Sequence, residues 1–109
     1  MGSPPYGCSW TGVAGHVQDL EGNPLLGYPV HVWGGGIDQT IMSGANTRHN
    51  TIYGSEAAWE QFFDNKPKPI EIRVRLHDNQ GRPISEEIVI NMPGYCGAAL
   101  AYVIFTQNH

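Results

Sequence analysis

Histidines are the residues of this chain that are most suited to metal chemistry, and there are five of them. His16 and His31 each fall on the polar side of an alternating segment. Two neighbouring strands could therefore bring them to one cation, together with His77 or Asp78. The sequence contains no HxH, HExxH or CxxC spacing, however. We therefore predict solvent-facing histidines, no metal site and no cofactor.

A catalytic nucleophile requires a neighbouring base and a group that orients this base. Ser43, Ser55 and Ser85 lack the nucleophile-elbow context that would expose a reactive hydroxyl. The adjacent carboxylates Glu86 and Glu87 would point to opposite faces of a strand. The sequence therefore predicts a protein that is not an enzyme.

Aromatic side chains are the better candidates for binding, because they can form a flat stacking surface for a carbohydrate or a peptide. The residues that could form such a surface are Tyr28, His31, Trp33, Tyr53 and Trp59. The alternative is that Trp10, Trp33 and Trp59 cover the core and the ends of the fold, since large aromatic side chains are usually well buried.

The two cysteines flank the strand-forming part of the chain, Cys8 before the first candidate strand and Cys96 before the last. A distant, even pair is typical of a single disulfide. Closing so long a loop would stabilise the fold by about 4 to 5 kcal/mol in the chain-entropy description. The alternative is two buried free thiols. A disulfide indicates an oxidising compartment, so we predict an extracellular or cell-surface location.

Composition indicates one small β-rich domain. The 109 residues include 14 glycines and 8 prolines, only 15% are charged, and the formal net charge is -4. This balance favours short strands with many turns, and it argues against nucleic-acid binding and membrane insertion. Residues 1–9 are expected to be an extended lead-in that starts with a cloning remnant, Met1-Gly2-Ser3, with any targeting signal elsewhere in a longer protein. Residues 10–109 are expected to form a single domain.

Alternating apolar residues predict about seven strands. The clearest is 70–77, in which Ile70, Ile72, Val74 and Leu76 alternate with polar residues. The segment 53–63 fits either a strand or a single helical turn, and 43–51 is predicted to be a loop. The remaining candidate strands are 11–19, 28–33, 37–42, 84–91 and 100–105. Pro29 has no amide donor, which predicts an edge or a bulge where its strand begins.

Two turn segments share their chemistry. Asp19-Leu20-Glu21-Gly22-Asn23-Pro24 lies between the first two candidate strands, and the stretch 12–36 therefore predicts a β-hairpin. Asp78-Asn79-Gln80-Gly81-Arg82-Pro83 has Asp, Gly and Pro at the same offsets. The repeated pattern is explained by similar turn requirements, with an internal duplication as the alternative.

The pattern Gly12-Val13-x-Gly15-x-Val17-x-Asp19-x-x-Gly22-x-Pro24-Leu25, with Asp78-x-x-Gly81-x-Pro83 and the apolar last strand, resembles carboxypeptidase regulatory-like domains. These are transthyretin-like (prealbumin-like) sandwiches related to adhesin repeats. The resemblance implies an all-β, seven-stranded Greek-key sandwich of the transthyretin-like or immunoglobulin-like kind. It also implies an accessory, spacer or adhesive module without catalytic residues, as in bacterial surface or secreted proteins.

One departure from adhesin repeats concerns their isopeptide bond, which starts from a lysine on the first strand. Gln18 lies on this strand, and the lysines of the chain are Lys66 and Lys68 in a proline-flanked loop. We therefore expect no isopeptide bond and suggest that Cys8 and Cys96 replace it as the covalent lock. The predicted function is a structural spacer, stalk or adhesive unit with neighbouring domains as partners. The alternative is a carbohydrate- or protein-binding accessory domain of a secreted enzyme.

Overall fold

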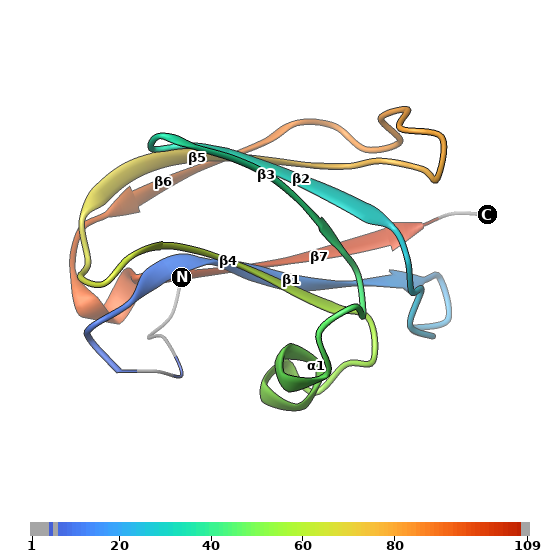
Figure 1. Ribbon diagram of the computed structural model, residues 1–109, viewed down its shortest axis with the longest axis horizontal. Helices are drawn as coiled ribbons and strands as arrows, with labels where there is room; N and C mark the ends of the chain where they lie inside the picture. The colour runs from blue at the N-terminus through green and yellow to red at the C-terminus, as the bar shows by residue number, and fades with distance from the viewer. Residues whose placement is uncertain (1–4, 6, 108–109) are drawn as a thin grey trace.

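The structure is a computed structural model that describes residue 5 and residues 7–107 (Figure 1). The predicted cloning remnant and part of the lead-in lie outside the described residues. The described part contains strands, one short α-helix and one 3-10 helix. In chain order these are β1 (Thr11–Asp19), β2 (Pro29–Gly34), β3 (Ile37–Met42), α1 (Thr47–Tyr53), β4 (Ala58–Asp64), β5 (Pro69–Leu76), β6 (Ile88–Pro93), η1 (Cys96–Ala98) and β7 (Leu100–Gln107).

The strands form two sheets, one with the order β4-β1-β7 and one with the order β3-β2-β5-β6. Neighbouring strands are antiparallel, except that β1 and β7 run parallel. The sheets lie face to face and enclose one apolar cluster to which both contribute (Figure 1). The prediction of an all-β fold with two layers is therefore confirmed.

The core follows the alternation in the sequence. On β5, Ile72, Val74 and Leu76 are buried, while the residues between them are partly exposed. Val30 and Val32 lie beside them on the neighbouring strand β2, with Val32 paired to Val74. Side chains from the other sheet complete this cluster, namely Val13, Val17, Trp59, Phe63, Ala101 and Phe105.

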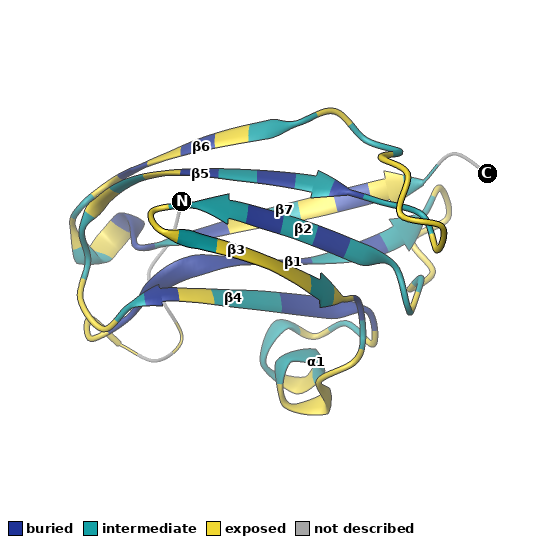
Figure 2. Cartoon of the chain, turned by 45° about the horizontal axis from the view of Figure 1, so that its top comes forward, coloured by how far each residue is buried: buried dark blue, intermediate teal, exposed yellow. Residues whose placement is uncertain are grey.

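Strand β1 is buried along most of its length (Figure 2). It lies between β4 and β7, so both of its backbone edges are hydrogen-bonded. Ala14, on its outer side, is fully buried because it lies between its partners Glu60 and Tyr102. Residues on both sides of β1 are therefore buried, and not only its valines.

The predicted hairpin over 12–36 is wrong, because β1 and β2 lie in different sheets. The two segments pair only at the turn, where Leu25 N donates to Val17 O and an isolated bridge joins Gln18 to Pro24. The chain then crosses to the other sheet. The buried Ser43 hydroxyl holds this crossing, donating to Leu25 O and accepting from Tyr28 N. Pro29 is the first residue of β2, which is an interior strand and not an edge.

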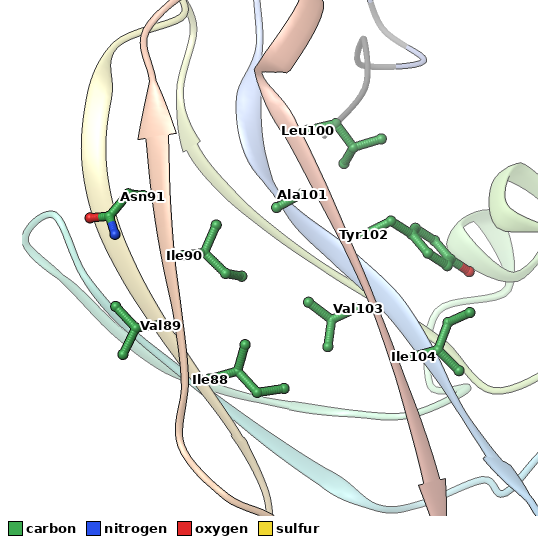
Figure 3. A pocket seen from close by; sticks show the side chains of 9 residues that line it. All are labelled: Ile88, Val89, Ile90, Asn91, Leu100, Ala101, Tyr102, Val103 and Ile104. Atoms are coloured by element: carbon green, nitrogen blue, oxygen red, sulfur yellow. The ribbon is translucent and has the colours of Figure 1, made fainter.

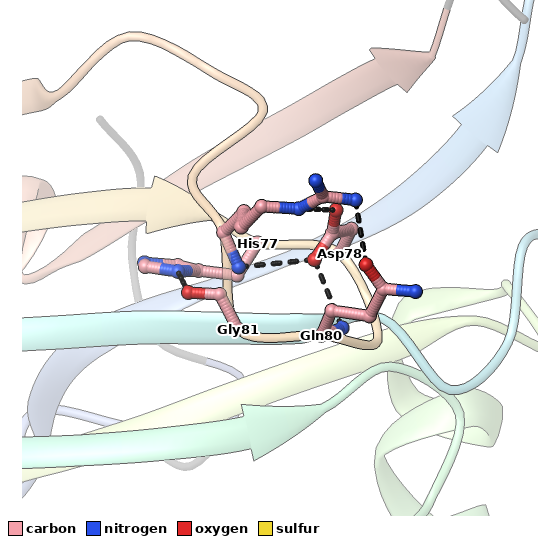
Figure 4. Close-up of polar contacts among 5 residues, drawn as sticks. His77, Asp78, Gln80 and Gly81 are labelled. Carbon is pink, nitrogen blue, oxygen red and sulfur yellow. Dashed lines mark hydrogen bonds and ion pairs between the residues drawn. The ribbon is translucent and has the colours of Figure 1, made fainter.

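The two similar turns have matching hydrogen bonds. Asp19 Oδ1 accepts from the backbone amides two and four residues later, and Asp78 Oδ1 does the same with Gln80 and Arg82 (Figure 4). In both turns the glycine amide donates to the aspartate carbonyl. The predicted turn chemistry is confirmed. In the second turn the chain continues as a true hairpin, since β5 pairs with β6.

Two element boundaries differ from the predictions. The predicted loop 43–51 contains most of α1, which Asn46 caps by accepting from the amides of Arg48 and His49 and which ends at the left-handed Gly54. The strand expected over 84–91 starts only at Ile88, because the Ser85 hydroxyl accepts from the Leu76 amide in place of a ladder bond. In the ambiguous segment 53–63 the structure has a strand, β4, from Ala58 onward.

The two lateral sides of the sandwich differ. On one side the edge strands β3 and β4 come into contact. On the other side β6 and β7 face each other across a groove of about 830 Å³ (Figure 3). We call this the β6–β7 groove; it is lined by Ile88, Val89, Ile90, Asn91, Leu100, Ala101, Tyr102, Val103 and Ile104.

Candidate functional site

A disulfide joins Cys8 to Cys96, with the two Cα atoms 5.2 Å apart, as predicted from the cysteine positions. It links the segment before β1 to η1, the turn that leads into β7. Two hydrogen bonds support the same junction, since the Thr11 hydroxyl and the Gly12 amide both donate to Ala99 O at 3.0 Å. The starts of β1 and β7 are therefore tied together by a covalent bond and by backbone contacts.

The five predicted ligand-binding residues do not form one surface. Trp59 has no exposed surface and belongs to the core, where its ring lies 6.2 Å from that of Phe105. Tyr28 packs against the core from the chain crossing. Tyr53 lies at the end of α1, on the other sheet, and donates to Glu60. The prediction of a shared stacking surface is therefore corrected, and only His31 and Trp33 lie together.

His31 and Trp33 form a stacked pair on the outer face of β2. Their ring centroids are 4.3 Å apart with an interplanar angle of 24°. His31 Nε2 lies 2.6 Å from Asp38 Oδ1 on β3, which holds the imidazole in place. On β5 the register places Arg75 opposite His31 and Arg73 opposite Trp33. We call this arrangement the His31–Trp33 face.

Arg73, one of the two arginines on this face, lies between two carboxylates. Arg73 contacts Glu71 at 2.7 Å and Glu87 at 2.9 Å. The hydrogen bond to Glu71 and the charges of both carboxylates raise the pKa of Arg73 above its ordinary value. The positive charge is therefore permanent, but it is largely neutralised by its neighbours.

A small cavity of about 250 Å³ adjoins the same face and is lined by Pro29, His31, Thr40, His77 and Gly81. His77 Nδ1 lies 3.0 Å from Gly81 O, and therefore carries the proton in this contact (Figure 4). His77 Nε2 is buried and has no hydrogen-bond partner among residues 5 and 7–107. The His77 ring lies beside the His31 ring, with the two centroids 5.8 Å apart.

A second polar cluster, which the sequence did not indicate, lies under α1 on the three-stranded sheet. Glu60 accepts from the Tyr53 hydroxyl at 2.7 Å, and its other oxygen is 3.2 Å from His49 Nε2. The Glu60 side chain is only 8% exposed, so these contacts occur away from bulk water. They attach the helix to β4.

The cluster continues through aromatic contacts to β7. The Tyr53 and Tyr102 ring centroids are 5.6 Å apart, and the Tyr102 hydroxyl lies 2.7 Å from His16 Nδ1. Burial raises the pKa of Tyr102 above its ordinary value, so the phenol stays protonated at neutral pH. His16 also contacts Gln18. These residues form a continuous row of hydrogen bonds and tilted ring contacts.

His16 does not meet the other histidines of the predicted site, although His31 and His77 are neighbours. His16 lies on β1 and His31 on β2, in different sheets, so the shared cation considered from the sequence has no counterpart in this arrangement. In the part of the chain that the structure describes, no group of three or more histidine, cysteine or acidic residues could hold a metal ion.

The two turn aspartates have altered acidity for a simple reason. Backbone amides donate hydrogen bonds to each carboxyl and lower its pKa below the ordinary value. The largest effect comes from the Asn23 amide on Asp19 and from the Arg82 amide on Asp78. The pKa of Asp64 is lowered as well, mainly by its hydrogen bond with Lys68. These oxygens are engaged in turn contacts.

Within the described residues, no helix has the length and apolar character that a membrane crossing requires. Comparison with protein-family models, with curated proteins and with solved structures finds no match to this chain. Function must therefore be argued from the geometry.

Proposed function

We propose that the chain is a non-catalytic spacer or stalk module that carries tensile load along its long axis in an extracellular or cell-surface protein. The observation that carries the proposal is the parallel pairing of β1 with β7, with the disulfide Cys8–Cys96 at the start of both strands. The disulfide supports the proposed oxidising compartment.

The parallel pair determines where external force would act. The register runs from Gly12 opposite Leu100 to Asp19 opposite Gln107. The chain therefore reaches β1 at one end of the sandwich and leaves β7 at the other (Figure 1). The longest dimension is 37 Å. Segments attached before β1 and after β7 would pull in opposite directions along the strands.

The disulfide would provide the shortest covalent path for such a force. Tension applied before Cys8 passes through the sulfur bridge to Cys96, then along β7, which is already extended. The bridge spans a sequence separation of 88 residues. The chain between the two cysteines is closed into a loop, so it cannot be drawn out while the disulfide is intact.

The β1–β7 pair would be a second load-bearing element if the disulfide were reduced. Force along the strands would shear the pair, and the evenly spaced hydrogen bonds of a parallel ladder would share the load. Force across the strand ends would instead break these bonds one after another.

The resemblance to carboxypeptidase regulatory-like domains supports the same function. We propose a seven-stranded Greek-key sandwich of the transthyretin-like kind, of bacterial origin and with neighbouring domains as its mechanical partners. The two sheets of three and four strands and the paired Asp-x-x-Gly-x-Pro turns fit this proposal.

The test compares two pulling directions in a single-molecule force measurement on the double variant Cys8→Ser, Cys96→Ser. In one protein the handles are attached at the two chain ends, which shears β1 against β7. In the other protein, one handle stays at the N-terminal end and the second is attached at Gly97→Cys. Both handles then act near the starts of β1 and β7. We expect a clearly higher unfolding force in the shear direction at the same loading rate. Equal forces, or a lower force in shear, would contradict the proposal.

A second candidate function is binding of a hydroxyl-rich ligand such as a carbohydrate at the His31–Trp33 face. The specific observation is the stacked pair of His31 and Trp33 beside a small cavity that His31 and His77 both line. An aromatic platform with nearby hydrogen-bonding groups is the arrangement that sugar rings require.

The test of this second function is a titration of oligosaccharides followed by protein NMR, on the chain and on Trp33→Ala. Tyr95→Ala serves as the matched control, since Tyr95 is 61% exposed and lies in the turn between β6 and η1. Binding that Trp33→Ala abolishes and Tyr95→Ala leaves unchanged would support the function. Absence of shifts across a glycan panel, or shifts equally affected by both variants, would exclude it.

A further inference from the structure

The β6–β7 groove separates two free sheet edges. Among the described residues, β6 pairs only with β5 and β7 pairs only with β1. Each strand therefore has one row of backbone amides and carbonyls directed toward the groove side without a strand partner. Such edges are templates for the addition of another strand.

The floor of the groove is apolar. Ile88 and Ile90 point from β6 toward β7, and Val103 points back toward them (Figure 3). Ile90 and Ala101 belong to the buried core, while Ile88 and Val103 pack against it and remain partly exposed. Side chains that enter the groove would therefore extend the existing core.

The edges of the groove have none of the charges that usually protect free strands. The sequences of β6, IVINMP, and β7, LAYVIFTQ, contain no charged residue. Edge strands β3 and β4, which contact each other on the opposite side, carry Asp38, Glu60 and Asp64. Exposed apolar side chains accompany the free edges, with Val89 47% and Ile104 52% exposed. The strand edges without protection are thus those on the open side.

We propose that the β6–β7 groove binds an extended, uncharged segment of a partner protein, which adds to β7 as a fourth strand of the smaller sheet. An added strand would pair with the row of amides and carbonyls on the β7 edge along its length, which a lipid or another apolar small molecule cannot do.

The geometry also limits the sequence of the segment. The groove follows β7 from Leu100 to Ile104, a length of roughly 17 Å at the rise of a β-strand. Alternate side chains of an added strand would point into the groove, so the segment should carry small or branched apolar residues at every second position. Charged residues would be tolerated only at its ends.

The experiment uses the whole oxidised chain and a synthetic peptide of alternating valine and threonine with a lysine at each end. A peptide of the same composition with its valines grouped is the control. Binding is followed by NMR, with panning of a random peptide library as an independent search for ligands. We expect shifts at the β6 and β7 amides, tighter binding of the alternating peptide, and library hits with alternating apolar residues.

Two exposed apolar positions provide matched variants. Ile104→Lys places a charge on β7, whereas Leu20→Lys places one in the first turn, where Leu20 is 68% exposed. Ile104→Lys should weaken peptide binding by about tenfold or more, and Leu20→Lys should leave it unchanged. The proposal is overturned if both peptides bind alike or neither they nor the library yields a ligand. It is also overturned if the chain self-associates through this edge, because a second copy is then the occupant.

Discussion

A glycine in the middle of β1 allows the largest core side chain to lie against the sheet. A Cβ atom added at Gly15 would clash with the backbone oxygen of Val103 and would lie 2.7 Å from Trp59 Cζ2. Neither neighbour can move freely, since one is main chain and the other is fully buried.

We expect Gly15→Ala to lower the free energy of unfolding by about 3 kcal/mol through overpacking. Gly97→Ala is the control, because its nearest contacts are 3.7 and 3.8 Å away, and it should change stability by less than about 1 kcal/mol. Chemical denaturation of the oxidised proteins measures both. Similar values for the two variants would show that β1 and Trp59 are not packed this closely.

The turn aspartates predict a pH dependence of stability. The pKa values of Asp19 and Asp78 lie below the ordinary 3.8 because backbone amides stabilise the charged form in the fold. A group with a lowered folded-state pKa contributes stability that is complete above its unfolded pKa and is lost as the pH falls through the folded pKa. The stabilising contribution should therefore disappear below about pH 4.

The measurement is the urea midpoint between about pH 6 and pH 2 for the chain and for the double variant Asp19→Asn, Asp78→Asn. The variant keeps an acceptor oxygen in each turn but has no charge to titrate. We expect a flatter pH profile for the variant, with the smallest difference between the two proteins at the acid end. Parallel profiles would mean that other carboxyls cause the acid sensitivity.

The sequence predicts whether a side chain points inward or outward for one tryptophan, Trp33, and not for another, Trp59. Trp33 follows Val32 in an alternating strand, so its outward position could be predicted from the pattern. Trp59 lies where strand and helical turn were equally compatible with the sequence, and its face could not be assigned. Its burial depends on Gly15 on a neighbouring strand, a long-range contact that local spacing does not encode.

At the scale of elements, pairing was harder to predict than the elements themselves. The turns at Asp19 and Asp78 have matching hydrogen bonds, yet only the second joins paired strands of one sheet. Local turn chemistry determines the reversal, whereas the sheet that each strand joins depends on where its apolar face is buried. The first turn is followed by a crossing at Ser43, which no local pattern indicates.

The short helix was missed for a related reason. α1 has no buried residue, so it lacks the apolar periodicity by which helices are recognised. Its N-cap, Asn46, lay in the predicted loop 43–51, and its C-cap, Gly54, lay in the ambiguous segment 53–63. Tertiary contacts with Glu60, and not an apolar stripe, hold it against the sheet.

This attachment predicts a local effect. In Glu60→Ala the Tyr53 hydroxyl loses this acceptor and His49 loses its ion-pair partner, so α1 should open more often. Hydrogen exchange should become faster in residues 47–53 and change little in β2 and β5. Glu56→Ala, at an exposed position in the next segment, is the control. Uniformly faster exchange throughout the chain would indicate global destabilisation and contradict a local role.

In the whole molecule, the disulfide and the β1–β7 pair join the two ends of the chain. The disulfide could be predicted from the sequence, because the chain has an even number of cysteines and the two lie far apart, before the first and the last strand. The parallel direction of β1 and β7 was not predictable, yet it places the attachment points at opposite ends of a 37 Å body. The bridge, together with this direction, is what makes the domain suitable as an inextensible spacer.

The most direct test of this claim is the gain in length when a single molecule is pulled from its two ends to complete unfolding. With the disulfide intact, the segment from Cys96 to Gln107 is the only part of residues 8–107 that can extend, to roughly 40 Å in total, so this part should gain less than roughly 20 Å over its folded length. After reduction, or in the double variant Cys8→Ser, Cys96→Ser, the whole chain extends and the gain should be roughly 300 Å. A long gain in the oxidised protein, or no difference between the two states, would contradict the account.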